Sequence, residues 1–216
     1  MASRQIKENR TIISKDLIVD YMPFEISKEA INESMKENGG RLIVKGTLQR
    51  AESKNQNGRI YPKDILVREA KKYAQVQVRE RRALGELDHP DSSVVNLNNV
   101  SHNVLEMKWE GDDLNGTVEV LSTPAGNILR ELFKSGIKLG ISSRGLGSVK
   151  ELYEDGDDQP TVQVQPDFEL IAFDFVSNPS THGAFLSPVN ESVNKSQKST
   201  KYHKVNQIVT DILSGE

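Results

Sequence analysis

The chain has 216 residues, and 28 Lys or Arg against 31 Asp or Glu leave a formal net charge of −3. This balance provides no basic surface for a nucleic-acid partner. The sequence has no cysteine, which excludes disulfides, thiolate metal sites and thiol nucleophiles. Its apolar runs are far shorter than the ~20 residues of a membrane span, and no apolar signal segment follows Met1. We therefore expect neither a membrane-spanning nor a conventionally secreted protein.

The periodicity of apolar residues predicts a succession of short elements. In chain order these are a helix over 28–36 capped by Ser27, a strand over 41–50, a helix from Pro62 to about Glu80, a hairpin between Leu105 and Leu121, a helix between Thr123 and Gly136, and strands over 139–149, 161–165 and 168–176. Strands outnumber helices, and a hairpin joins two of them. The order predicts an α+β fold that is mainly β, with helices inserted.

The composition divides the chain into three parts. Residues 1–40 are expected to form an N-terminal arm with one short helix, and residues 41–186 a globular domain. The last part, 187–216, begins with a Ser/Asn/Lys-rich stretch typical of a flexible linker. It ends in an amphipathic pattern of Val205, Ile208, Val209, Ile212 and Leu213, which predicts a short helix that needs a partner surface.

Without cysteine, a nucleophilic mechanism requires a Ser or Thr activated by a base, and histidine is the usual base. Of the four histidines, His203 lies in the predicted linker, His182 in a loop and His102 in a hairpin strand, so we expect these to be solvated or structural. His89 precedes Pro90, which favours extended geometry at the histidine. It is the candidate base, although a structural role remains the alternative.

Two further segments suggest chemistry. Ser142 and Ser143 lie in the glycine-rich stretch 140–148, where a substrate chain could approach the backbone and main-chain N–H groups could bind an oxyanion. An ordinary edge strand or bulge is the alternative. Asp174 is the single acid in the apolar run 170–176, and a buried carboxylate needs a partner such as a histidine. Sequence spacing alone does not bring these positions together.

Four blocks of the chain resemble a known family, the prohead core proteases of large contractile-tailed phages. The blocks are NGRIYP at 57–62, ALGELDHP at 83–90, GISSRGLGS at 140–148 and DFVSNPS at 174–180. These serine endopeptidases are similar in fold to assemblin, the herpesvirus capsid maturation protease. The resemblance covers about residues 41–186 and implies a mainly antiparallel, barrel-like β core with surrounding helices.

The resemblance implies a role for each matching residue. His89 would be the general base, Ser142 the nucleophile, and Asp174 the group that orients the imidazole. Ser143 is the alternative nucleophile. Asp88 is also near His89 in sequence, but side chains of neighbouring residues in an extended segment point apart.

Arg144 and Gly145 follow the two serines and could position substrate or help to bind an oxyanion. A surface salt bridge is the alternative role for Arg144. The implied acyl-transfer chemistry requires neither a metal nor a cofactor.

The resemblance also implies substrates. The family cuts scaffold, core and capsid proteins after Glu, with an aliphatic residue two positions earlier. The chain contains such sites near both ends, Ile6-Lys7-Glu8 and the looser Val189-Asn190-Glu191, so self-cleavage after Glu8 and Glu191 is expected and residues 187–216 are a candidate propeptide.

The expected location is the host cytoplasm, inside the immature capsid, and we expect a homo-oligomer whose partners are scaffold, core and major capsid proteins. The alternative is a noncatalytic internal scaffold protein with the same fold.

Overall fold

The computed structural model describes the backbone of residues 7–11 and the whole of residues 15–153 and 161–177. The chain divides into two compact units, Met1–Ala184 and Phe185–Glu216. All of the described residues belong to the first unit. The predicted linker and amphipathic helix of 187–216, and the cleavage site at Glu191, lie outside the described residues.

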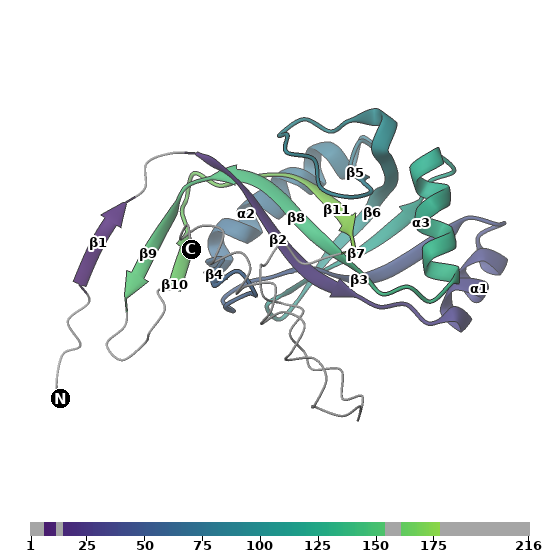
Figure 1. Ribbon diagram of the computed structural model, residues 1–216, viewed down its shortest axis with the longest axis horizontal. Helices are drawn as coiled ribbons and strands as arrows, with labels where there is room; N and C mark the ends of the chain where they lie inside the picture. Colours follow the sequence, from purple (N-terminus) through teal and green to yellow (C-terminus); the bar gives the residue numbers. More distant parts are fainter. Residues whose placement is uncertain (1–6, 12–14, 154–160, 178–216) are drawn as a thin grey trace, which may run out of the picture. The chain divides into compact units, whose positions relative to one another are not determined.

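Strands dominate the described unit (Figure 1). They are β1 (Lys7–Thr11), β2 (Asp16–Phe24), β3 (Leu42–Arg50), β4 (Arg59–Ile60), β5 (Leu84–Glu86), β6 (Val100–Glu110), β7 (Asp113–Val120), β8 (Leu139–Gly147), β9 (Val149–Tyr153), β10 (Thr161–Val164) and β11 (Glu169–Val176). The α-helices are α1 (Lys28–Glu37), α2 (Lys63–Tyr73) and α3 (Pro124–Lys134); a π-helical turn, Ala74–Val78, extends α2, and a 3-10 turn, Leu97–Asn99, precedes β6. The predicted α+β class is confirmed.

The strands form three sheets, with the orders β1-β9-β10-β4, β11-β8-β2 and β3-β7-β6-β5. Pairing is antiparallel except between β10 and β4. A single parallel bridge between Leu87 and Phe175 links the segment after β5 to β11, and β2 contacts β3 at the opposite edge. No ladder joins β2 to β3, so the strands of the described residues approach a barrel without closing one.

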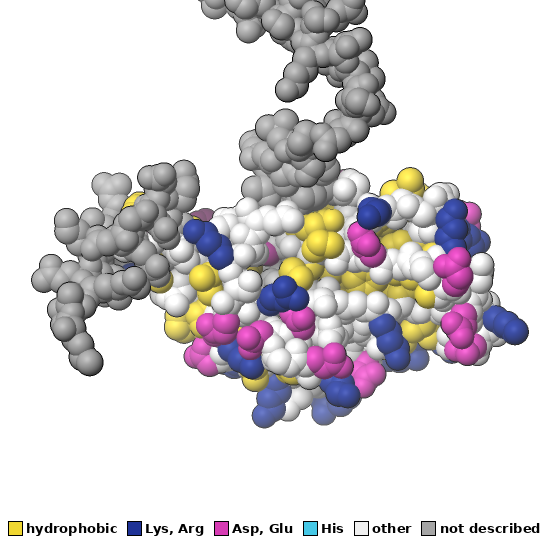
Figure 2. Space-filling model, turned by 90° about the horizontal axis from the view of Figure 1, so that it is seen from below, with side chains coloured by type: hydrophobic (Ala, Val, Ile, Leu, Met, Phe, Trp, Pro, Cys, Tyr) yellow, Lys and Arg dark blue, Asp and Glu magenta, His cyan; other side chains and the backbone are white. Residues whose placement is uncertain are grey.

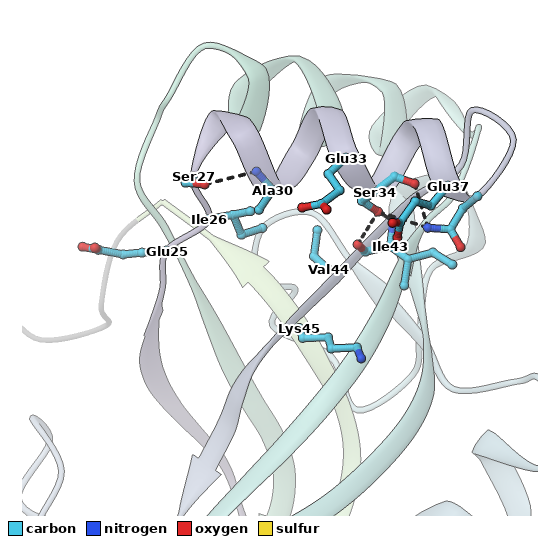
Figure 3. A pocket seen from close by; sticks show the side chains of 11 residues that line it. Glu25, Ile26, Ser27, Ala30, Glu33, Ser34, Glu37, Ile43, Val44 and Lys45 are labelled. Atoms are coloured by element: carbon cyan, nitrogen blue, oxygen red, sulfur yellow. Dashed lines mark hydrogen bonds between the residues drawn. The ribbon is translucent and has the colours of Figure 1, made fainter.

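The helices begin where the capping residues predict. Ser27 Oγ accepts the Ala30 N–H at 3.1 Å to cap α1, and Thr123 caps α3, whose first residue is Pro124. Ser34 fixes α1 to β3, because its hydroxyl donates to the Ile43 carbonyl at 2.6 Å (Figure 3). The acidic groove in that view lies between α1 and β3 and contains none of the candidate catalytic residues.

Phe175 on β11 lies at the centre of the core and is fully buried. The Phe24 ring of β2 packs edge-on against it at 5.2 Å between centroids, and Phe133 of α3 does so at 5.4 Å. His102 of β6 contacts the same ring at 4.7 Å. One side chain therefore ties four elements together in the core.

β2 lies within the stretch that the sequence assigned to an N-terminal arm. It pairs with β8 from Asp16 opposite Gly147 to Phe24 opposite Leu139. Ile18 and Phe24 are buried in the core. This part of 1–40 is therefore integrated into the fold.

Charges are mixed on the face shown in Figure 2, where lysine and arginine side chains alternate with aspartate and glutamate. Among the described residues this face shows no extended basic patch of the kind that follows a nucleic-acid backbone. None of the described helices is long and apolar enough to cross a membrane.

Gly85 provides a test of how closely β5 packs on β11. A Cβ at this position would lie 1.9 Å from the Phe173 carbonyl oxygen and 2.3 Å from His102 Nε2. Since a backbone atom blocks the space, Gly85→Ala should lower the free energy of unfolding by about 3 kcal/mol. Chemical denaturation measures this loss.

Gly111→Ala is the control for this substitution. No atom lies within 4 Å of an added Cβ there, and only the φ of +61° is unfavourable. We expect a loss of about 1 kcal/mol. Equal losses at Gly85 and Gly111 would contradict the close packing of β5 on β11.

Candidate active site

The pairing of β8 with β11 places a serine opposite an acid. Ser142 lies opposite Asp174, and Ser143 lies opposite Phe173. Side chains of directly opposed residues share a face of the sheet, and neighbours along a strand occupy opposite faces. Ser142 and Asp174 therefore share one face, whereas Ser143 lies on the other.

His89 reaches this face because the segment after β5 is held on β11. Leu87 forms a bridge with Phe175, and the Asp88 N–H donates to the Phe175 carbonyl at 2.8 Å. Asp88 has a φ of +71°, which turns the chain sharply, and its carboxylate accepts the His89 N–H at 2.9 Å. The histidine is thereby placed beside Asp174, the residue before Phe175.

The three side chains meet in the order Ser, His, Asp. His89 Nε2 lies 2.7 Å from Ser142 Oγ, and His89 Nδ1 lies 3.3 Å from Asp174 Oδ2. The latter contact has an ion-pair distance without hydrogen-bond alignment, so Nδ1 has no aligned partner among the described residues. This order of contacts is that of a nucleophile, a general base and an orienting acid.

Ser142 has a second partner. Its hydroxyl donates to the main-chain carbonyl of Asp20 on β2 at 2.9 Å, and the side chain is fully buried. His89 is more accessible, with 16% of its side chain exposed. Because one hydroxyl proton faces two acceptors, the Asp20 carbonyl competes with His89 for it.

Asp174 is ionised despite being buried. Burial alone would raise its pKa, but the contact with His89, the charge and hydrogen bonds of Arg144, and the Glu86 N–H together hold the pKa below its usual value. The Glu86 N–H donates to Asp174 Oδ1 at 3.0 Å. A charged Asp174 can stabilise an imidazolium at His89.

Ser143 belongs to a different network on the other face of β8. Its hydroxyl accepts a hydrogen bond from Gln49 Nε2 at 2.8 Å. Nearby, the buried Asp20 carboxylate accepts hydrogen bonds from the Tyr61 hydroxyl, from Asn57 Nδ2 at 2.6 Å and from Arg59 at 2.9 Å. The polar side chains of the 57–62 block therefore anchor β2 beside β8.

Arg144 and Gly145 are both buried within the fold. Arg144 is fully buried, and its guanidinium contacts Asp174 with Nε at 2.8 Å. A Cβ on Gly145 would lie 2.4 Å from the Phe168 ring and 2.6 Å from the Glu169 carbonyl oxygen. Close packing against Phe168 and the first residue of β11 thus accounts for the glycine at position 145.

Glu86 is a site residue that the sequence analysis did not single out. It is fully buried at the end of β5, and its Oε1 accepts a hydrogen bond from Arg144 at 3.0 Å. The available signal was an acid three residues before His89 in an otherwise apolar strand. Its contact with Arg144 depends on the meeting of two distant strands.

His102 is structural, as expected. It is fully buried, with Nδ1 2.8 Å from Ser101 Oγ and Nε2 2.9 Å from the Phe173 carbonyl oxygen. Burial lowers the pKa of His102 to about 4, against the opposing effects of Asp174 and the Phe173 carbonyl. His182 and His203 lie outside the described residues.

The remaining predictions concern the cleavage site at Glu8 and metal binding. Glu8 lies in β1, opposite Leu152 of β9. Among residues 7–11, 15–153 and 161–177, no group of three or more His, Asp or Glu side chains could hold a metal ion.

Ser142, His89 and Asp174 thus lie in contact in that order, and comparison with known proteins gives the family. The family described as "Prohead core protein serine protease" matches residues 6–197. A curated relative, the "Prohead core protein protease" of Enterobacteria phage T4, is 32% identical over 174 residues, which are 79% of this chain and 78% of the relative. The chain belongs to the prohead core protein serine protease family.

A solved structure supports the fold. The structure of the bacteriophage T4 capsid assembly protease, gp21, matches with a TM-score of 0.61 and 28% sequence identity. The match covers 76% of this chain and 98% of that structure. The resemblance to prohead proteases noted in the sequence is confirmed.

The buried His102 predicts a pH-dependent stability. The unfolded histidine takes up a proton near pH 6.5, whereas the folded one remains neutral down to about pH 4. The unfolded state therefore binds more protons in this window, and the free energy of unfolding should fall by about 3 kcal/mol as the pH falls from 6.5 to 4. Urea unfolding at several pH values measures the loss.

His102→Gln is the matched variant. It should be less stable at pH 7 and lose most of the dependence between pH 6.5 and 4, since its side chain does not titrate. The lowered pKa of Asp174 adds a separate loss only as the pH falls below its usual value of 3.8. An unchanged slope in His102→Gln would show that another group causes the dependence.

Proposed function

We propose that this protein is a serine endopeptidase that matures phage proheads by cutting scaffold, core and capsid proteins after Glu in aliphatic-x-Glu sequences. Ser142 is the nucleophile, His89 the general base and Asp174 the residue that orients and stabilises the imidazolium. The observation that carries the proposal is the 2.7 Å contact between His89 Nε2 and Ser142 Oγ, with Asp174 on the other side of the ring.

The geometry favours Ser142 over Ser143. Ser142 contacts His89, whereas Ser143 accepts a hydrogen bond from Gln49 on the opposite face of β8. Gln49 donates a hydrogen bond from its amide N–H to Ser143, and an amide cannot act as a general base. Ser143 thus supports the packing of the sheet behind the nucleophile.

The proposed reaction is acyl transfer. Ser142 Oγ attacks the scissile carbonyl while His89 Nε2 takes its proton, and main-chain N–H groups around Ser142 stabilise the oxyanion. The imidazolium then gives its proton to the leaving amine, and the acyl-enzyme forms. Water, deprotonated by His89, attacks the acyl group, and the proton returns to Ser142 as the carboxylic product leaves.

Burial of Ser142 implies a closed resting state. The hydroxyl is fully buried and shares its proton between His89 and the Asp20 carbonyl. Substrate must therefore gain access to Ser142 and break the hydrogen bond to Asp20. Afterwards the hydroxyl proton is directed to His89 alone.

The proposed substrates place the enzyme inside the prohead, assembled in the host cytoplasm, with scaffold, core and major capsid proteins as partners. We propose that it acts as a homo-oligomer. Self-cleavage after Glu8 and Glu191 would trim both ends of the chain. A noncatalytic scaffold protein with the same fold is the alternative that the following experiments exclude or support.

Peptide cleavage tests the three assigned roles. With an Ile-x-Glu peptide as substrate, Ser142→Ala and His89→Ala should lower kcat by at least about a thousandfold, because the nucleophile or its base is lost. Ser143→Ala should keep most of the activity, and a matched Ile-x-Gln peptide should be a poor substrate. Circular dichroism confirms that each variant is folded.

If folded Ser143→Ala is inactive while Ser142→Ala cleaves, the nucleophile is the other serine. If wild type leaves every peptide intact, at high protein concentration and with a capsid-protein substrate, the scaffold alternative is favoured.

Self-cleavage has its own measurement. Intact-mass analysis over time should detect fragments that end at Glu8 and Glu191 in wild type, and none in Ser142→Ala. Glu8→Gln should abolish only the first product and Glu191→Gln only the second, since each removes one acidic residue before the cleaved bond. Fragments that persist in Ser142→Ala would show that another protease produced them.

A further inference from the structure

A buried charge cluster lies behind His89. The Arg144 guanidinium contacts Asp174 twice, with Nε 2.8 Å from Oδ2 and Nη2 3.2 Å from Oδ1. Nη2 also lies 3.0 Å from Glu86 Oε1. All three side chains are fully buried, so solvent screens these charges little.

The charges of this cluster do not cancel. Two carboxylates, Glu86 and Asp174, face one guanidinium, and Oε2 of Glu86 has no hydrogen-bond partner among the described residues. The formal charges of two carboxylates and one guanidinium sum to −1. Proton transfer from Ser142 to His89 adds a positive charge beside Asp174 and balances the cluster.

The same cluster holds the segment that follows His89. Arg144 Nη1 donates to the Ser92 carbonyl at 2.6 Å, and the Asn96 N–H donates to Glu86 Oε1 at 3.0 Å. Ser92 and Asn96 are themselves exposed. Arg144 and Glu86 therefore hold the exposed segment that follows His89 through hydrogen bonds from below.

The other titratable groups around His89 are either neutral near neutral pH or exposed to solvent, which screens their charge. His102 of β6, whose pKa burial lowers to about 4, is neutral. Tyr73 of α2 is neutral because burial, with Asp174 adding to the effect, raises its pKa. Asp88 is exposed to solvent, and its carboxylate faces the His89 main-chain N–H. Among the described residues, the buried charges joined to Asp174 are thus Arg144, which contacts it, and Glu86, which contacts Arg144. The buried Asp20 carboxylate lies near Ser143 on the other face of β8 and is paired with Arg59.

We propose that Arg144 and Glu86 are positioning residues of the protease, which hold Asp174 and the segment after His89 and together set the charge against which His89 is protonated. Neither residue touches the substrate. This inference rests on the proposed function, because it assumes that His89 is the general base. In this proposal Arg144 acts on Asp174, and main-chain N–H groups, not Arg144, bind the oxyanion.

Two substitutions of opposite charge effect test this role through the pH profile of kcat/KM. Arg144→Gln leaves two negative charges, which favour the imidazolium, so the acid limb should move to higher pH. Glu86→Gln leaves a neutral cluster, so the acid limb should move to lower pH and kcat should fall. For charges this close and buried, each shift should be about half a pH unit or more.

Arg144→Lys separates charge from position. It keeps the positive charge but lacks the planar fork that contacts Asp174, Glu86 and Ser92 together. Its acid limb should remain near that of wild type while kcat falls at least about tenfold. Arg50→Gln removes an arginine from an exposed pair with Asp113, and this control should keep the wild-type profile.

The outcomes distinguish this inference from the proposed function. If Ser142→Ala or His89→Ala cleaves normally, the proposed function itself fails. If both are inactive, but Arg144→Gln and Glu86→Gln shift the limb in the same direction or not at all, only the charge role is overturned. If Arg144→Gln does not fold, the other two variants still test the proposal. An acid limb that does not move in Glu86→Gln, or one that moves in Arg144→Lys, contradicts it.

Discussion

The burial of the Asp174 carboxylate is the constraint on which the site depends. A carboxylate removed from water costs several kcal/mol unless charged and hydrogen-bonding groups replace the solvent. Here the replacements come from distant parts of the chain: Arg144 on β8, the Glu86 N–H on β5, and His89 after β5. The hydrogen bonds and charge contacts that the Asp174 carboxylate requires therefore bring together the elements that form the site.

The strand β8 separates two polar networks. On one face, Ser142 contacts His89 above the charged cluster, and on the other, Ser143 contacts Gln49 near the anchored Asp20 carboxylate. The hydrogen bond from Ser142 Oγ to the Asp20 carbonyl joins the two networks. The position of β2 therefore influences the nucleophile directly, and a change that loosens β2 would also change which acceptor receives the Ser142 proton.

Local signals predicted the elements that depend on neighbouring residues. Thr123 and Pro124 begin α3, and the turn at Gly111 joins β6 to β7, because caps and tight turns are settled within a few residues. The role of β2 was missed, since its partner β8 lies more than a hundred residues away and no local pattern identifies it. Glu86 was missed for a similar reason. Its burial becomes intelligible only when Arg144 is placed beside it.

In the proposed mechanism, His89 activates the hydroxyl of Ser142. The most direct measurement is to treat the protein with a fluorophosphonate, which phosphonylates activated serines with loss of fluoride, and to locate the adduct by tandem mass spectrometry. We expect a single adduct on Ser142 that disappears in folded His89→Ala. An adduct on Ser143, or labelling of Ser142 that is as fast in His89→Ala as in wild type, would contradict it.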